Sequence, residues 1–150
     1  MAALEAHGLA PAALAVTSLK DPAAIPLIEV AITHHRPSII LNTTAFSALR
    51  DDDTTVLDVA DTPVLQVVLS GSSHEAWSAS ARGLSTSDLA MNVVLPEIDG
   101  RLLTRAISFK APAPIDPRLE YEAQAHAPAP DRVHYVARLA AAWVGLARKP

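Results

Sequence analysis

The 150-residue chain contains no cysteine, and this absence excludes several kinds of chemistry. Disulfide bonds, zinc–thiolate sites, iron–sulfur clusters and thiol nucleophiles all need cysteine side chains. Aromatic residues are also scarce, at 4% of the chain, although hydrophobic residues make up 50%. The hydrophobic core must therefore be built mainly from alanine, valine, leucine and isoleucine.

Long apolar runs and an excess of positive charge are missing as well. No apolar stretch reaches the roughly 18 residues that a membrane-spanning helix needs. The first ten residues lack the basic start and apolar region of a signal peptide, so we expect a cytoplasmic protein. Twelve basic and 16 acidic residues give a net charge of −4, which argues against nucleic acid as the main partner.

Short apolar runs alternate with helical patterns along the chain. Strands are expected at residues 14–19, 38–42, 63–69 and 102–110, and helices at 24–35, 54–60, 74–81, 88–95 and 133–147. This alternation favours parallel pairing with right-handed crossovers. The predicted fold is α/β, a small doubly wound, mostly parallel sheet with flanking helices. Because helical patterns run close to both ends, we expect residues 1–150 to be a single domain that is a fragment of a longer protein.

Local signals sharpen these boundaries. Asp53 is expected to cap the 54–60 helix, and Ser72 with Glu75 fits a capping box before the 74–81 helix. The residues from Ser85 to Asp88 repeat that signal. The arginine and threonine residues of the 102–110 strand place it near an edge of the sheet, and residues 111–117 form an extended connection.

Three of the predicted strands end in polar residues. These ends are Thr17–Ser18 with Lys20 nearby, Asn42–Thr44, and Ser70–Ser73 around Gly71. Ligands of open α/β sheets bind beyond the carboxyl ends of the strands, so we expect these groups to converge on one rim. The loop at Gly71 presents backbone N–H groups suited to an anion such as a carboxylate, although no Walker sequence follows it. The alternative is that these residues serve only as caps and turns.

The Leu-Pro-Glu-Ile-Asp-Gly sequence at residues 95–100 is the most informative segment. Pro96 is expected to end the preceding element, and Gly100 permits a tight turn that holds Glu97 and Asp99 in place. Carboxylates fixed beside a buried element suit proton transfer or metal handling. The alternative is a surface turn with two solvated acids.

The histidines and tryptophans carry weaker signals. His74 lies in the first turn of a predicted helix, from which it could reach a ligand at the rim. The histidines at 34 and 35 close a helix, where a positive charge suits the dipole. No histidine pair has the spacing of a metal site, and no nucleophile elbow is present. Trp77 and Trp143 are expected to pack in the core or against another domain.

Three stretches, at residues 40–47, 64–68 and 91–107, resemble the large subunit of aerobic, ATP-dependent cobaltochelatase of the CobN type. That family is related to the large, porphyrin-binding subunit of magnesium chelatase. The 95–100 sequence is similar in both families, whereas its continuation to Arg105 favours the cobalt branch. The resemblance covers nearly all 150 residues but only a fraction of the family protein, which is several-fold longer.

The resemblance implies a role in corrin biosynthesis, the insertion of Co²⁺ into hydrogenobyrinic acid a,c-diamide. Co²⁺ is then a substrate, while two partner subunits, one an AAA+ ATPase, use ATP and Mg²⁺; the isolated segment is expected to be inactive. The acids Glu97 and Asp99 become candidate catalytic groups that accept pyrrole N–H protons, and His74 and Glu97 become candidate metal ligands. The candidate substrate-binding residues are Asn42, Thr43, Ser72, Ser73, Arg101 and Arg105.

Three alternatives stay open from the sequence. The segment could belong to a magnesium chelatase large subunit, which inserts Mg²⁺ into protoporphyrin IX. It could be a stand-alone module that captures a polyanionic small molecule at the strand ends. It could also be a structural domain that organises its neighbours, with the active site elsewhere.

Overall fold

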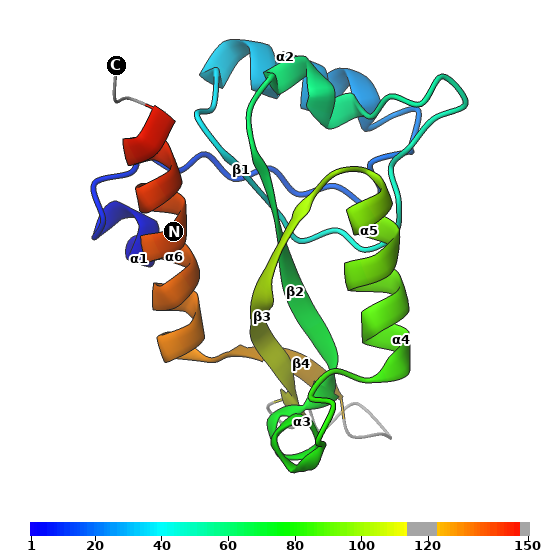
Figure 1. Ribbon diagram of the computed structural model, residues 1–150, viewed down its shortest axis with the longest axis vertical. Coiled ribbons are helices and arrows are strands. Elements are labelled where there is room, and N and C mark those ends of the chain that lie inside the picture. Colours follow the sequence, from blue (N-terminus) through cyan, green and yellow to red (C-terminus); the bar gives the residue numbers. More distant parts are fainter. Residues whose placement is uncertain (114–122, 148–150) are drawn as a thin grey trace.

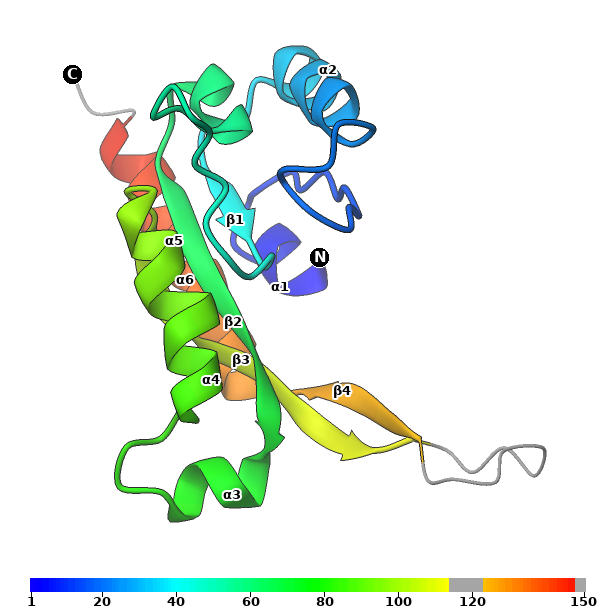
Figure 2. The ribbon, with the colours of Figure 1, turned by 90° about the vertical axis from the view of Figure 1, so that its right-hand side faces the viewer.

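A four-stranded sheet forms the centre of the computed structural model, which describes residues 1–113 and 123–147 (Figure 1). The strands lie in the order β1 (Ile40–Asn42), β2 (Val64–Ser73), β3 (Leu102–Pro112) and β4 (Gln124–Pro128). The first three are parallel, and β4 is antiparallel to β3. The β3–β4 ribbon projects from the body of the molecule (Figure 2). The predicted α/β fold with a mostly parallel sheet is confirmed.

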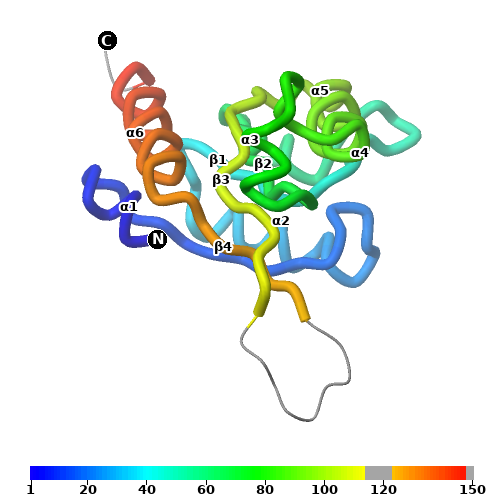
Figure 3. The backbone as a smooth tube through the Cα atoms, turned by 90° about the horizontal axis from the view of Figure 1, so that it is seen from below, coloured from blue at the N-terminus to red at the C-terminus, as the bar shows by residue number. Residues whose placement is uncertain are grey.

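Helices flank the sheet on both sides. The helices are α1 (Ala2–Glu5), α2 (Ile25–His35), the 3₁₀ helix η1 (Val56–Ala60), α3 (His74–Ala79), α4 (Thr86–Leu89), the π-helix η2 (Ala90–Val94), α5 (Leu95–Ile98) and α6 (Pro130–Ala147). Figure 3 shows α6 on one side of the strands and α4 with α5 on the other. None of the helices within the described residues is long and apolar enough to cross a membrane.

The core is mainly aliphatic, as the composition requires, and it is divided into separate clusters of buried side chains. One cluster joins α2 and η1 to the start of the sheet and buries Leu19, Ala24, Ile28, Ile32, Ala48, Val56 and Leu57. A smaller cluster buries Val68, Ala106 and Phe109, with Trp77 packed against it. On α6 the residues Val136, Ala137, Ala140 and Val144 are buried at the 3.6-residue spacing of an amphipathic helix.

One of the strand expectations is wrong. Residues 14–19 form no strand; Leu14 is 43% exposed, and Val16 and Leu19 instead pack in the cluster around α2. The 102–110 strand lies next to the edge of the sheet, as expected, because β4 pairs with Ser108–Pro112 on its outer side. Part of the expected extended connection therefore belongs to β3, and its residues 114–117 lie outside the described residues.

Two helix starts also differ from expectation. Asp53 does not cap η1; Thr55 does, and Asp58 completes a capping box with it. Ser72 lies within β2, because pairing with β3 continues as far as Ser73. The Ser73 hydroxyl accepts the hydrogen bond from Ala76 N that begins α3. The cap at Ser85 is confirmed, since its hydroxyl accepts from Asp88 N.

Candidate functional site

The elements α4, η2 and α5 follow one another without a break and form one helix over residues 86–98. This helix does not end at Pro96, contrary to expectation. Leu95 N donates to Ala90 O, so the helix widens into a π-turn just before the proline. This turn accommodates a residue that has no N–H to continue the α-helical ladder. The helix ends instead at Gly100, which has a φ of 74° and donates to Glu97 O, while Arg101 N donates to Pro96 O. This Schellman-type ending confirms the glycine turn and fixes the direction of the chain on either side of it.

Asp99 is buried at the end of this helix, where three donors engage its carboxylate. Its Oδ2 lies 2.5 Å from Nη2 of Arg101, in an ion pair whose two side chains are 2% exposed or less. Ala48 N donates to the same oxygen at 2.6 Å, and the Ser47 hydroxyl donates to Oδ1. The Asp99 carboxylate therefore ties the helix end to the segment that follows β1.

The Arg101 guanidinium connects this pair to the sheet. Its Nη1 donates to Gln66 Oε1 at 3.2 Å, and Asn42 Nδ2 donates to the same oxygen at 2.7 Å. Asn42 Nδ2 and Gln66 Nε2 both donate to Thr44 O, at 3.0 and 3.1 Å. Parallel pairing of β1 and β2 places Asn42 opposite Gln66, which is why their amides meet. We call these six residues, Asn42, Thr44, Ser47, Gln66, Asp99 and Arg101, the Asp99–Arg101 cluster.

Burial governs the electrostatics of the cluster. It lowers the pKa of the Arg101 guanidinium from its ordinary value, and the charge of Asp99 opposes that effect. Within the described parts of the chain, Arg101 Nε is the buried side-chain polar atom left without a hydrogen bond. Sequence reasoning missed Gln66, although a glutamine inside the apolar run of residues 64–69 was a signal that could have identified it.

Glu97 has a different environment from Asp99, although the two are only two residues apart. It lies in the last turn of the helix and is exposed. Among residues 1–113 and 123–147, its carboxylate takes part in no ion pair. The turn therefore holds one acid buried and paired and leaves the other available at the surface.

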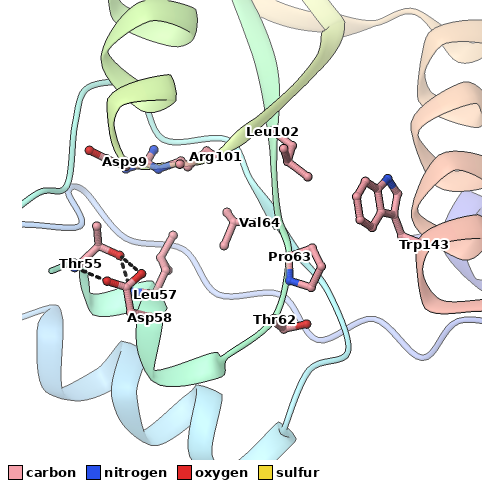
Figure 4. A pocket seen from close by; sticks show the side chains of 11 residues that line it. Thr55, Leu57, Asp58, Thr62, Pro63, Val64, Asp99, Arg101, Leu102 and Trp143 are labelled. Atoms are coloured by element: carbon pink, nitrogen blue, oxygen red, sulfur yellow. Dashed lines mark hydrogen bonds and ion pairs between the residues drawn. The ribbon is translucent and has the colours of Figure 1, made fainter. Parts of the chain in front are cut away.

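A pocket of about 300 Å³ adjoins the cluster. It lies between η1, the starts of β2 and β3, and Trp143 on the facing side of α6 (Figure 4). Its lining residues are Thr55, Leu57, Asp58, Thr62, Pro63, Val64, Asp99, Gly100, Arg101, Leu102 and Trp143. The pocket is at the amino ends of β2 and β3, not at the carboxyl ends where sequence reasoning expected ligands.

The single rim expected at the strand ends is divided in two. Asn42, the last residue of β1, pairs with Gln66, but β2 continues for seven residues to Ser73. At about 3.3 Å per residue, the two strand ends are roughly 23 Å apart. Asn42 and Arg101 therefore lie together with exposed Thr43 beside them, whereas Ser72, Ser73 and His74 lie at the far end of β2.

The groups at the far end have partners of their own. Gly71 N and the Ser70 hydroxyl donate to Asp88, at 3.0 and 2.7 Å, so the anion at this loop is a carboxylate of the chain itself. His74 packs edge-on against Phe109, with ring centroids 4.9 Å apart. Arg105 is not at this end but midway along β3, where its guanidinium stacks 3.2 Å above the Tyr135 ring centroid.

The two candidate metal ligands are not brought together. His74 begins α3 and Glu97 ends the 86–98 helix, at opposite ends of β2. In the part of the chain that the structure describes, no group of three or more His, Asp or Glu side chains could hold a metal ion.

Comparisons with known proteins extend this description. A sequence model of the CobN/Magnesium Chelatase family matches residues 1–150. The chain is 41% identical over 149 residues to an aerobic cobaltochelatase subunit CobN from Sinorhizobium sp, and 38% identical over 148 residues to the subunit of the same name from Pseudomonas aeruginosa. These matches cover 97% and 98% of this chain and 12% of each relative.

The fold also matches a solved structure, the catalytic subunit of cobaltochelatase from Mycobacterium tuberculosis. The TM-score is 0.73 at 28% sequence identity. The match covers 93% of this chain and 12% of the solved chain.

Proposed function

Because the chain belongs to the CobN/magnesium chelatase family, we propose that it forms one wall of the substrate cavity in a cobaltochelatase large subunit. The proposed reaction is the insertion of Co²⁺ into hydrogenobyrinic acid a,c-diamide during corrin biosynthesis. Support comes from the relatives, which are named as cobaltochelatase subunits and match 97–98% of this chain. Co²⁺ is a substrate in this proposal. ATP and Mg²⁺ are used by an AAA+ ATPase subunit and a second small subunit.

Metal insertion requires the macrocycle to lose a proton. As Co²⁺ binds to the ring nitrogens, the N–H proton of the corrin ring leaves and must be accepted by a base. Glu97 is the proposed acceptor, because its carboxylate is exposed at the end of a helix whose position is fixed by the Asp99–Arg101 cluster. This exposed carboxylate beside a rigid, buried ion pair is the observation that carries the assignment.

Asp99 takes a positioning role in this proposal. Its two oxygens already accept from Ser47, Ala48 and Arg101, so it holds the helix end against the segment after β1. Arg101 acts through the same contacts. Thr43, which is exposed beside the cluster, remains a candidate to contact substrate carboxylates, and Asn42 supports it from the sheet.

The test replaces Glu97 with glutamine in the complete large subunit and measures ATP-dependent cobalt insertion. Loss of a general base typically lowers turnover about 100-fold or more, and glutamine keeps the shape of the side chain. The matched control is Glu75→Gln, because Glu75 is also an exposed acid on a helix but lies at the other end of β2. Near-normal turnover of E97Q would remove Glu97 from the mechanism.

The choice between cobalt and magnesium is tested with the same preparation. The family description includes both chelatases, whereas the two relatives named above are cobaltochelatase subunits, which favours cobalt. Insertion of Mg²⁺ into protoporphyrin IX, with no insertion of Co²⁺ into the corrin precursor, would reverse this assignment.

A further inference from the structure

Phe46 has a backbone conformation that large side chains rarely adopt. Its φ is 65°, in the left-handed region, and its side chain is 56% exposed. The other non-glycine residues with positive φ in the described chain have local reasons for it. Arg36 and Asp61 end helices α2 and η1, and Asp53 is of a type that tolerates this region. Phe46 ends no helix, and an aromatic residue in this region is strained.

The contacts around Phe46 hold the backbone and leave the ring outside. Phe46 N donates to Met91 O at 2.7 Å, in the helix over residues 86–98. The next two residues, Ser47 and Ala48, both donate to the Asp99 carboxylate. Ala48 is 1% exposed, so the chain is anchored in the core directly after the exposed ring. Strain of this kind persists where surrounding structure enforces it, and such positions cluster at functional sites.

The helix that Phe46 contacts adds two exposed apolar side chains. Val94 is 53% exposed and Ile98 is 61% exposed, and they lie four residues apart, on one face of the helix. Residues 46–48 are bonded to this helix at both Met91 and Asp99, so they run beside the same stretch, as the cyan segment near α5 shows in Figure 1. We call Phe46, Val94 and Ile98 the Phe46 ledge. Glu97 is adjacent to it in sequence.

We propose that the Phe46 ledge is the surface against which the conjugated macrocycle lies. This inference rests on the proposed function and assigns the part of the chain that contacts the substrate ring. An aromatic side chain offers a large flat area and gains from stacking on another π-system. The bonded backbone of residues 46–48 fixes where the ring is presented on the surface, and the neighbouring Glu97 carboxylate lies at the border, where ring N–H groups would meet it.

A flat ligand suits these observations better than a protein partner does. The ledge is small, it contains one exposed aromatic ring on a backbone that is held in place, and it adjoins an acid that has no ion-pair partner among the described residues. Small-molecule sites combine apolar walls with a few placed polar groups in this way.

The experiment measures binding without turnover. In the complete large subunit, Phe46→Gly and Phe46→Asn are compared with Phe46→Tyr by titration with hydrogenobyrinic acid a,c-diamide, with no Co²⁺ or ATP. Glycine and asparagine both accept the left-handed conformation but remove the ring, so we expect a Kd at least about tenfold weaker. Tyrosine keeps the ring and should bind within about twofold of the unchanged protein. Val59→Ala, which alters an exposed valine of η1, is the control and should leave the Kd unchanged.

Unchanged affinity in both F46G and F46N would overturn the proposal. If E97Q nevertheless lost turnover, the ledge alone would be rejected and the proposed function would stand. If E97Q were also normal, Glu97 would be removed from the mechanism as well, whereas failure of the unchanged protein to insert Co²⁺ would refute the proposed function itself. A lower melting temperature for F46N with an unchanged Kd would show that the ledge packs against another part of the protein, which also overturns the proposal.

Discussion

Removing the Asp99 carboxylate should destabilise the protein strongly. In Asp99→Ala the Arg101 guanidinium stays buried without its counter-charge, and both Ala48 N and the Ser47 hydroxyl lose their acceptor. Breaking a buried ion pair by deleting one partner costs about 3–5 kcal/mol. For a domain of this size, that corresponds to a fall in melting temperature of roughly 6–20 °C.

A double-mutant cycle separates the charge from the packing. Asp99→Leu leaves an unpaired buried cation, whereas the Asp99→Leu/Arg101→Met double variant leaves no charge. Gln66 Oε1 would still accept from Asn42 in the double variant. We therefore expect the double variant to lose less free energy of unfolding than the two single variants lose together. The difference, which is the coupling energy of the pair, should be about 2 kcal/mol or more.

Urea unfolding followed by far-UV circular dichroism at pH 7 gives the free energies. Amide hydrogen exchange adds a local readout, because release of Ala48 N should raise the exchange rates of residues 46–48. Asp51→Asn, at an exposed position in the same connection, is the control and should leave the unfolding midpoint unchanged. A loss of less than about 1 kcal/mol for D99A, or strictly additive single variants, would refute the reasoning.

Two further predictions concern the other end of the sheet. Asp88→Ala leaves the buried Ser70 hydroxyl without its acceptor and also releases Gly71 N, which is exposed. Thermal unfolding should show a loss of about 1–3 kcal/mol, mainly from Ser70, while Asp88→Asn, which keeps an oxygen acceptor, should lose less. His126 has a pKa below its ordinary value, first because of burial and then because of Lys110. Between that lowered value and the ordinary pKa of about 6.5, the unfolded chain binds more protons, so stability should fall as the pH drops through this range. An NMR titration of His126 should give a midpoint below that of an unfolded peptide, and Lys110→Gln should move it upward; a midpoint unaffected by this substitution would contradict the assigned contribution of Lys110.

Regular elements with a strong local pattern were predictable from the sequence. The helix over residues 133–147 follows from its 3.6-residue periodicity, and it corresponds to α6 (Pro130–Ala147). The apolar runs of residues 38–42 and 63–69 correspond to β1 and β2. The run of residues 14–19 looks similar but forms no strand, and it pairs with none of the four strands in residues 1–113 and 123–147 that would complete its backbone hydrogen bonds.

The expectation that the polar strand ends share one rim was wrong, for a reason that cannot be read from any local sequence pattern. Each strand end was recognised as polar, but the position of one end relative to another depends on strand length and register. Three residues of β1 pair with the first residues of a ten-residue β2. Asn42 therefore meets Gln66 and Arg101, while Ser72 and Ser73 lie beyond the reach of β1.

By itself the sequence excluded the kinds of chemistry that need cysteine. It also determined an aliphatic core, a mostly parallel α/β arrangement and a glycine turn at Gly100. It also contained the resemblance to chelatase large subunits. Tertiary structure alone decided which of two neighbouring acids is available. Asp99 is buried because Ser47, Ala48 and Arg101, brought from the segment after β1 and from the start of β3, surround it. Glu97 lies two residues before Asp99, so the turn of the helix directs its side chain away from that segment, and it remains exposed.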